Sequence, residues 1–360
     1  MAQIEGQLVS ACGIEPVRIH FDHRILAIEP IEHAPPQWIL PGVLDWHNHG
    51  GGGGDVMDGE SGIRSLASTH ARFGMTGFLA TTVTAERSQV DTVLEAAARV
   101  MQDRHSGEAR CLGVHLEGPY LSAQKLGAQP ERTRPVDLEE LSTWFQTGVV
   151  RVMTYAPEQD PDGLLPALAR EHAVRLQIGH SGCAYHQAAS LLRENHGVTH
   201  LFNAMTGVTH RHPGVALAAL NTASFAEIIC DGLHVEEPAF QLARRQISML
   251  YSVTDATAAA GMPDGEYRLG SHRVWKADGA VRLADGTLAG SAATAVTTVS
   301  TLLEFGLPWP EIVAMTATRP AQWLGFADVG EITVGAYADF LLWTGAGLQS
   351  VCIGGDQISQ

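Results

Sequence analysis

The stretch Pro41-Gly-Val-Leu-Asp-Trp-His47-Asn-His49-Gly50 opens the part of the chain that decides the fold. An apolar run ends there in two histidines and a glycine-rich tip, and a helical pattern follows over 61–73. The same order of apolar run, polar or glycine-rich tip and helical stretch recurs down to about residue 256. It indicates βα units, in which crossover helices join parallel strands.

Eight of these apolar runs are predicted strands. They are 42–47, 77–83, 111–117, 149–155, 174–179, 198–202, 226–230 and 249–254. Between them, apolar residues spaced three or four apart predict helices such as 61–73, 87–104, 138–145, 163–172 and 238–245. Eight such units in about 220 residues predict a (β/α)8 TIM-like barrel, because a closed parallel sheet leaves no free edge.

The two ends of the chain have a different pattern. Residues 1–40 and 326–360 contain short alternating segments, and 330–343 has a hairpin signature. We therefore expect a small β-sandwich domain formed from both termini, with residues 41–325 as the barrel. The segment 267–288, with Asp-Gly pairs at 278–279 and 285–286, predicts a β excursion near the eighth strand.

Composition excludes several classes of protein. The chain has 360 residues, 45% of them hydrophobic and 17% charged, which excludes a disordered or fibrous protein. A formal net charge of −16 repels a phosphate backbone, so we expect no nucleic-acid partner. No run approaches the roughly 18 apolar residues of a membrane span, and the start lacks a signal-peptide pattern, so a cytoplasmic protein without membrane contact is expected. The five cysteines are scattered without a CxxC pair, which favours reduced thiols.

Histidine is the unusual residue: there are 17, against only two lysines, Lys125 and Lys276. Residues two apart in a strand point the same way, so His47 and His49 present both imidazoles to one side of the first strand tip. Alone, this pattern is as compatible with a structural role as with a metal site. Most single histidines in such a chain lie at surfaces or helix ends, so only a cluster of histidines would indicate a metal site.

Other predicted strands also end in polar groups. Their tips carry Glu117, His180, His200 and Asp255. The carboxyl ends of barrel strands meet on one face, where such enzymes carry out chemistry. Imidazole and carboxylate together suit zinc or iron(II) better than magnesium or calcium, so the set predicts a divalent-metal site. Asp255 has a structural alternative, a helix N-cap before 256–260.

These motifs resemble the amidohydrolase superfamily and, more closely, the N-acetylglucosamine-6-phosphate deacetylase family. The matching stretches are PGVLDWHNHG (41–50), GVHLEGPYLS (113–122), TYAPE (154–158), IGHSGC (178–183), THLFNAMTG (199–207), ICDGLH (229–234), VTDA (253–256), LAGS (288–291) and GEITVGAYADF (330–340). The resemblance implies a metal-dependent hydrolase that removes acetate from the 2-acetamido group of N-acetylglucosamine 6-phosphate. It also implies a homodimer.

The resemblance assigns roles to the strand-tip residues. Glu117, His180 and His200 would hold one metal. His47 and His49, with Glu117 and Asp255, would hold a second, so one or two metals are expected, zinc first and iron as the alternative. Many relatives bridge two metals with a carboxylated lysine, but neither lysine here lies at a strand tip, which leaves Glu117 as the bridge. Asp255 would take a proton from the attacking water and pass it to the leaving amine.

The resemblance also assigns substrate contacts. They are Ala128, Gln129, Asn203, Ala204, Arg211, His234, Leu288, Ala289 and Gly290. Arg211 suits phosphate, because a guanidinium donates two parallel hydrogen bonds, although an ordinary surface arginine is the alternative. The chain departs from the family at Gln129, where a histidine is common. Gln129 can donate a hydrogen bond but carries no charge.

Three other functions stay open. The galactosamine epimer is the nearest, since no residue identifies the orientation of one hydroxyl. A deaminase or cyclic amidase would need substrate loops other than HLFNAM. A binding or scaffold protein on the same barrel would be expected to lose metal or proton-transfer residues, and all six are present.

Overall fold

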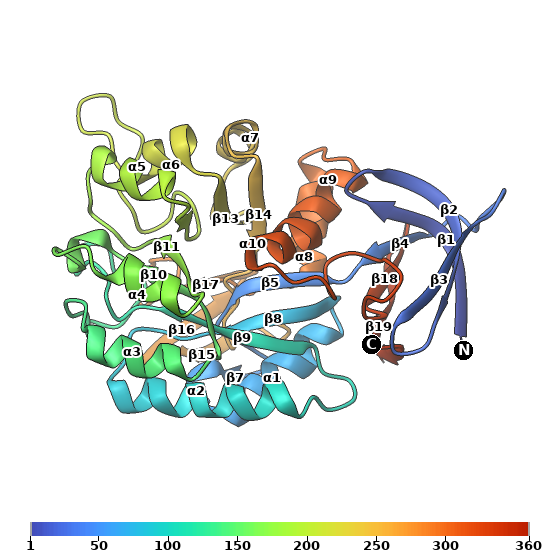
Figure 1. The fold of residues 1–360 in the computed structure, drawn as a ribbon, viewed down its shortest axis with the longest axis horizontal. Helices are drawn as coiled ribbons and strands as arrows, with labels where there is room; N and C mark the ends of the chain where they lie inside the picture. Colours follow the sequence, from blue (N-terminus) through green and yellow to red (C-terminus); the bar gives the residue numbers. More distant parts are fainter. Residues whose placement is uncertain (1, 359–360) are drawn as a thin grey trace.

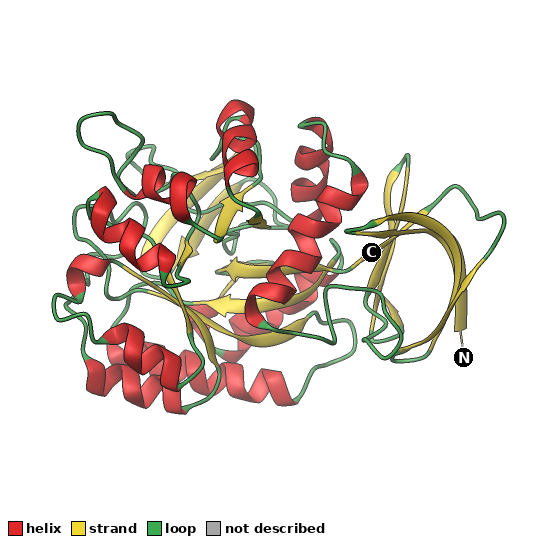
Figure 2. Ribbon diagram, turned by 45° about the horizontal axis from the view of Figure 1, so that its top comes forward, coloured by secondary structure: helices red, strands yellow, loops and turns green. Residues whose placement is uncertain are grey.

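The computed structural model describes residues 2–358 and contains a parallel barrel and a terminal β domain. The barrel strands are β5 (Val43–Asn48), β8 (Met75–Thr81), β9 (Arg110–Glu117), β10 (Val150–Tyr155), β11 (Arg175–Ile178), β12 (Gly197–Val198), β13 (Phe225–Ile229) and β14 (Met249–Val253). Each overlaps one predicted run, so the predicted (β/α)8 architecture is confirmed. Figure 2 shows these strands at the centre with helices outside them.

The barrel closes through a few bonds at the strand ends. Strands β5 to β12 form one ladder in the order β12-β11-β10-β9-β8-β5, and β13 pairs separately with β14. The backbone N–H of Asp255 donates to the carbonyl of His47 at 2.9 Å, and that of His49 to Ala256 at 2.8 Å, which joins β14 to β5. The N–H of Leu201 donates to the carbonyl of Glu227 at 2.9 Å and joins the β12 tip to β13. The closing bonds thus lie beside the strand-tip residues.

Helices cover the outside of the barrel. They are α1 (Glu60–Ala71), α2 (Arg87–Gln102), α3 (Leu138–Gln146), α4 (Leu165–Glu171), α5 (Tyr185–Arg193), α6 (Val215–Thr222), α7 (Glu237–Gln246), α8 (Ala295–Glu304), α9 (Trp309–Val313) and α10 (Arg319–Leu324). In α2, Val90, Val93, Leu94 and Val100 are buried at helical spacing against the barrel. Strands β5 and β8 are buried along their whole length, as expected for a sheet covered on both faces.

Both termini contribute to one seven-stranded sheet, drawn at one end of the molecule in Figure 1 and curved in Figure 2. Its strands are β1 (Ala2–Ser10), β2 (Gly13–Phe21), β3 (Ile25–Pro30), β4 (Trp38–Pro41), β18 (Phe340–Thr344), β19 (Gly347–Ile353) and β20 (Asp356–Ile358). The C-terminal strand β18 pairs with β4, so the predicted β domain from both termini is confirmed. The exact boundaries of residues 1–40, 41–325 and 326–360 stay a prediction.

The hairpin signature at 330–343 misled the prediction. The hairpin is formed by β18 and β19 instead. Segment 331–339 bonds to another part of the chain: the N–H of Gly335 donates to the carbonyl of Ile25, and that of Ala338 to His23. The alternation of apolar and polar residues over 330–343 indicated a half-buried segment, but it did not indicate the part of the chain to which this segment bonds.

The excursion after the eighth strand is a three-stranded sheet, as predicted. It contains β15 (Gly265–Leu269), β16 (His272–Ala277) and β17 (Ala280–Arg282).

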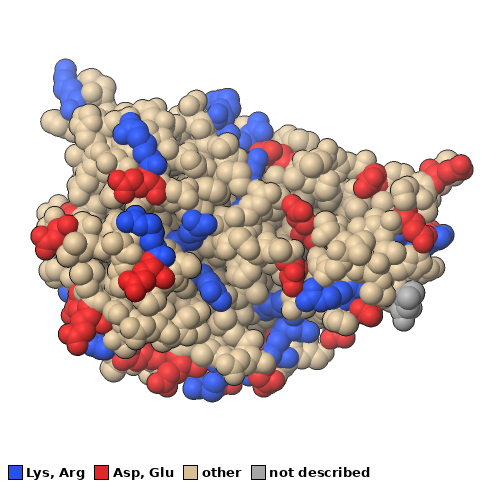
Figure 3. All heavy atoms as spheres, in the orientation of Figure 1, with Lys and Arg blue, Asp and Glu red and all other residues tan. Residues whose placement is uncertain are grey.

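Within residues 2–358, none of the helices has the length and apolar character that crossing a membrane requires. On the face drawn in Figure 3, acidic and basic side chains are interspersed rather than gathered into one basic stripe.

Candidate active site

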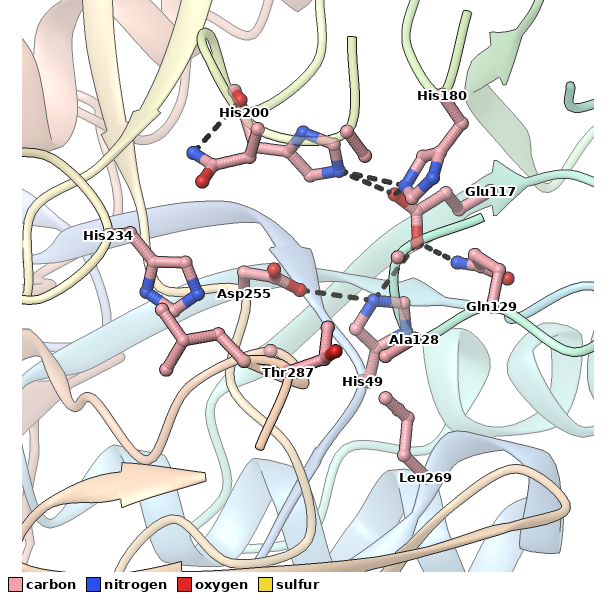
Figure 4. A pocket seen from close by; sticks show the side chains of 15 residues that line it. His49, Glu117, Ala128, Gln129, His180, His200, His234, Asp255, Leu269 and Thr287 are labelled. Carbon is pink, nitrogen blue, oxygen red and sulfur yellow. Dashed lines mark hydrogen bonds and ion pairs between the residues drawn. The ribbon is translucent and has the colours of Figure 1, made fainter. Parts of the chain in front are cut away.

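Six strand-tip side chains converge at the carboxyl end of the barrel. We call them the His/carboxylate cluster: His47, His49, Glu117, His180, His200 and Asp255. All six are buried. The structure therefore brings together every residue that the sequence analysis placed in a metal site, and all of them except His47 line one cavity (Figure 4).

Three residues of the cluster have an uncommon backbone conformation. The φ angles of His180, His200 and Asp255 are 47°, 28° and 50°. Residues other than glycine in this left-handed region cost on the order of 1–3 kcal/mol each and gather at functional sites. For Asp255 this backbone turn replaces the helix N-cap alternative, because no helix follows it over 256–260.

Glu117, His180 and His200 form a first ligand set. The Oε1 atom of Glu117 lies 3.1 Å from Nε2 of His180 and 3.1 Å from Nε2 of His200, and the two Nε2 atoms are 3.0 Å apart. Ligand atoms around a tetrahedral zinc ion with bonds of about 2.0–2.1 Å stand roughly 3.3 Å apart. The three atoms therefore have nearly the spacing of one face of a zinc tetrahedron.

His47, His49 and Asp255 form a second ligand set beside the first. The Nε2 atoms of the two histidines are 3.2 Å apart, and they lie 3.5 Å (His47) and 3.2 Å (His49) from Oδ1 of Asp255. Glu117 faces this set as well, with Oε1 3.4 Å from His47 and Oε2 3.2 Å from His49. Glu117 thus occupies the position of a carboxylate shared by two ligand sets.

Neighbouring carbonyls orient two of the four imidazoles. Nδ1 of His49 lies 3.1 Å from the carbonyl oxygen of Thr81, and Nδ1 of His180 lies 2.8 Å from that of Lys125. In a neutral imidazole, an Nδ1–H donated to a carbonyl leaves the lone pair on Nε2, which points into the cluster. This is the tautomer that a metal requires.

Opposite charges hold the cluster together. Burial lowers the pKa of His49, but hydrogen bonds and charges from Asp255 and Glu117 outweigh burial and raise it to about 9. Burial raises the pKa of Asp255, but the charge of His47 and the contact with His49 lower it to about 2. Burial also raises the pKa of Glu117, but the charges of His47 and His180 outweigh burial and hold it well below its ordinary value. Both carboxylates are therefore ionised at neutral pH, the form in which they bind metals.

A third histidine–carboxylate group, His47 with His115 and Glu227, has a different character. Both ring nitrogens of His115 are already engaged, with the carbonyl of Trp46 at 2.9 Å and the hydroxyl of Thr154 at 2.7 Å. Burial, with the nearby charge of His47, lowers the pKa of His115 to about 4, so its ring is neutral. This group therefore joins the cluster only through His47, and His115 has no ring nitrogen free to bind a metal.

The cluster lies at the base of a cavity of about 220 Å³. We call the other residues that line it the rim: Gly127, Ala128, Gln129, Asn203, Ala204, His234, Leu269, Thr287, Leu288 and Gly290. Seven of the nine predicted substrate contacts belong to the rim. The other two do not: Ala289 is fully buried in the apolar core, and Arg211 is exposed in the loop 207–213.

Gln129 has two buried partners that the sequence did not reveal. Its amide nitrogen donates to Oε2 of Glu117, and its amide oxygen accepts from the backbone N–H of Thr84 at 2.7 Å. It therefore supports the shared carboxylate besides lining the cavity.

Sequence reasoning missed several residues that act on the site. Glu227 bonds to Nδ1 of His47, and Asp231 accepts from Nδ1 of His234 at 2.7 Å. Leu269 and Thr287 bring the β15–β17 excursion to the rim. A glutamate inside the apolar run FAEIIC (225–230) was the available signal for Glu227, since a buried carboxylate needs partners. For Leu269 and Thr287 the sequence carried no signal.

Comparison with known proteins agrees with this geometry. Residues 38–357 match the amidohydrolase family. The chain belongs to the amidohydrolase family. Among its relatives in this family, the N-acetylglucosamine-6-phosphate deacetylase of Vibrio furnissii is 35% identical over 315 residues, covering 85% of this chain and 79% of the relative. The N-acetylgalactosamine-6-phosphate deacetylase of Escherichia coli O157:H7 is also 35% identical, over 357 residues, covering 94% and 93%.

A solved amidohydrolase structure shares the whole fold. It is N-acetyl-D-glucosamine-6-phosphate deacetylase from Mycobacterium smegmatis, as an Asp-to-Ala variant in complex with N-acetyl-D-glucosamine-6-phosphate. The TM-score is 0.91 at 28% sequence identity, and the match covers 99% of each chain. The similarity therefore includes the terminal β domain as well as the barrel.

Proposed function

We propose that the protein is a metal-dependent deacetylase that hydrolyses the N-acetyl group of N-acetylglucosamine 6-phosphate to give glucosamine 6-phosphate and acetate. The observation that carries the proposal is the convergence of two imidazole pairs, Glu117 and Asp255 at the base of one cavity. The names of the similar amidohydrolases support this substrate class.

The donor set fits divalent metals. Glu117, His180 and His200 would hold one ion, and His47, His49 and Asp255, with Glu117 shared, would hold a second. Imidazole nitrogen and carboxylate oxygen at these spacings suit zinc, with iron(II) as the alternative. When bound, such a metal supplies a Lewis acid that polarises the acetyl carbonyl and makes water more acidic.

Asp255 is the proposed proton carrier. Its side chain is 12% exposed, and Oδ1 lies at the boundary between the cluster and the cavity. An ionised carboxylate in this place takes a proton from the attacking water and returns it to the departing amine. The amine then leaves as a neutral group, and the acetic acid that remains releases its proton to solvent to become acetate.

His234 is the proposed partner of the acetamide group. Asp231 accepts a hydrogen bond from Nδ1 of His234, so Nε2 is the ring atom available to substrate. His234 lines the cavity next to Asp255 (Figure 4). Leu288 and Gly290 line the cavity as well, and Gly290 is needed there, because a Cβ atom would stand 2.8 Å from the carbonyl of Asp255.

Arg211 is the proposed phosphate contact, although it lies outside the cavity of its own chain. We propose a homodimer in which this exposed loop reaches the cavity of the second copy. Sedimentation of the protein with and without substrate tests the assembly, and a monomer in both states would contradict it.

A cytoplasmic location is part of the same proposal, because phosphorylated sugars are intracellular metabolites.

The galactosamine epimer is the second candidate substrate. The N-acetylgalactosamine-6-phosphate deacetylase relative matches a larger share of this chain, 94% against 85%, at the same identity. Acetate release from the 6-phosphates of both sugars, each beside its unphosphorylated sugar, tests the proposal. We expect turnover of the phosphorylated glucosamine derivative to be fastest. Acetate from none of the four would contradict the proposed function.

A further inference from the structure

Glu227 is a carboxylate buried inside the barrel wall. It lies in the middle of β13, its side chain is 0% exposed, and it points to the barrel interior rather than toward the helices. Removing an ionised carboxylate from water costs several kcal/mol unless hydrogen bonds replace the water. Its presence inside an otherwise apolar strand therefore calls for a function in this position.

Four donors surround this carboxylate. Oε2 accepts from Nδ1 of His47 at 3.0 Å and from the backbone N–H of His200 at 3.3 Å. Oε1 accepts from the amide of Gln177 at 2.9 Å and from the hydroxyl of Tyr251 at 3.3 Å. The side chain is thus held rigidly, and one of its oxygens contacts members of both ligand sets.

The contact with His47 differs from those of the other imidazoles. His49 and His180 donate Nδ1–H to backbone carbonyls, whereas His47 donates it to a carboxylate. A carboxylate partner fixes the tautomer, orients the ring and makes the opposite nitrogen a stronger metal donor. His115 packs edge-on against the His47 ring, with centroids 4.7 Å apart, but bonds elsewhere and cannot replace this partner.

We infer that Glu227 is a positioning residue that makes the His47/His49/Asp255 set able to hold its own metal. The inference rests on the metal-dependent function proposed above. Glu227 acts through Nδ1 of His47 and touches neither substrate nor the reacting atoms. The contact with the His200 backbone adds a link to the first ligand set, whose three ligand atoms do not otherwise depend on Glu227.

The test measures zinc affinity in the absence of substrate. Wild-type protein, E227A and E227Q are stripped of metal and titrated with zinc against a chromophoric chelator, after circular dichroism shows that each is folded. We expect two zinc ions in the wild type. In E227A the first should bind as in the wild type and the second about 10- to 100-fold more weakly.

E227Q separates hydrogen bonding from charge. Its amide oxygen can still accept from His47, but its NH2 group then faces the amide of Gln177, and the negative charge is lost. We expect an affinity for the second zinc between those of E227A and the wild type. E140Q is the matched control, because Glu140 is another buried carboxylate, paired with Arg134 away from the cluster, and its zinc binding should be unchanged.

Three results would overturn the inference. They are a wild type that binds a single zinc ion, an E227A protein with wild-type affinity for both ions, and an equal loss of affinity at both sites in E227A. The readout does not use the sugar substrate. An inactive wild-type enzyme with the expected zinc pattern would therefore contradict the proposed function and leave the role of Glu227 standing.

Discussion

The His/carboxylate cluster and the loop 207–213 are both assigned to the same reaction, yet they are built in opposite ways. In the cluster, Glu117 contacts four imidazoles and Gln129, and each of these is buried. In the loop, Arg211 and its neighbours His210 and His212 are exposed. The comparison teaches that the groups proposed to break the bond are preorganised by buried contacts, whereas the residue proposed to bind the phosphate lies on an exposed loop outside the cavity. Variants in the cluster should therefore affect all substrates alike, and variants in the loop should discriminate between them.

Asp255→Asn should have the largest effect. Asn keeps the size of the side chain but cannot carry the proton, and general acid–base catalysis is worth roughly 10²–10⁴-fold. We expect a loss of kcat of that order, equal in proportion for phosphorylated and free sugars, with the fold and at least one metal retained. Steady-state kinetics of acetate release and metal analysis check this.

The exposed Asp278→Asn serves as the control for Asp255→Asn, and its activity should equal that of the wild type. If Asp255→Asn kept more than about a tenth of the wild-type kcat, Asp255 would not be the proton carrier.

Arg211→Ala should have an intermediate and selective effect. A charge-assisted hydrogen bond to phosphate contributes on the order of 1.5–3 kcal/mol, so kcat/KM for the phosphorylated sugar should fall roughly 10- to 150-fold. The free sugar should be almost unaffected. Arg273→Ala, at an exposed arginine of β16, is the matched control. Equal losses on both sugars would show that Arg211 has a structural role and would remove the distinction between cluster and loop.

Asp231→Asn should have the smallest effect, on stability and its pH dependence. Burial disfavours the charged His234 ring, but Asp231 outweighs burial and raises its pKa above 6.5, while His234 helps to hold the pKa of Asp231 below 3.8 despite burial. The stabilisation that comes from the raised pKa of His234 is fully present below pH 6.5 and is lost as pH rises through the pKa of His234 in the folded protein. The stabilisation that comes from the lowered pKa of Asp231 is present above pH 3.8 and is lost as pH falls through the pKa of Asp231 in the folded protein.

The pair should therefore stabilise most between these limits. Denaturant unfolding of the wild type and of Asp231→Asn should give a larger difference in free energy of unfolding at about pH 5.5 than at about pH 9.5. A difference that does not change with pH would mean that the pair is not charged in the folded protein.

The barrel could be predicted from the sequence because each strand carries its own local signal. The run at 249–254 matches β14 (Met249–Val253) to one residue. The strand predicted at 198–202 was too long at its carboxyl end. Strand β12 ends at Val198, and the chain then turns through positive φ angles at His200 and Phe202. Apolar residues continue through that turn, so their pattern gave no sign of where the strand ends.

The site was predictable to the extent that strand tips meet on one face. That rule brought His47, Glu117 and Asp255 together without knowledge of any distance. It could not find Glu227, whose role depends on a hydrogen bond to a strand 180 residues away in sequence. Nor could it place Arg211, since the path of an exposed loop depends on contacts that local sequence does not specify.

The central claim is that the cluster holds two metals with Glu117 shared between them. Metal analysis of protein purified without chelator, beside a His47→Gln, His49→Asn double variant, tests it directly. We predict about two equivalents in the wild type and about one in the double variant, which should keep partial activity through the Glu117/His180/His200 set. One equivalent in both proteins would contradict the claim and would show that His47 and His49 support the site without binding metal.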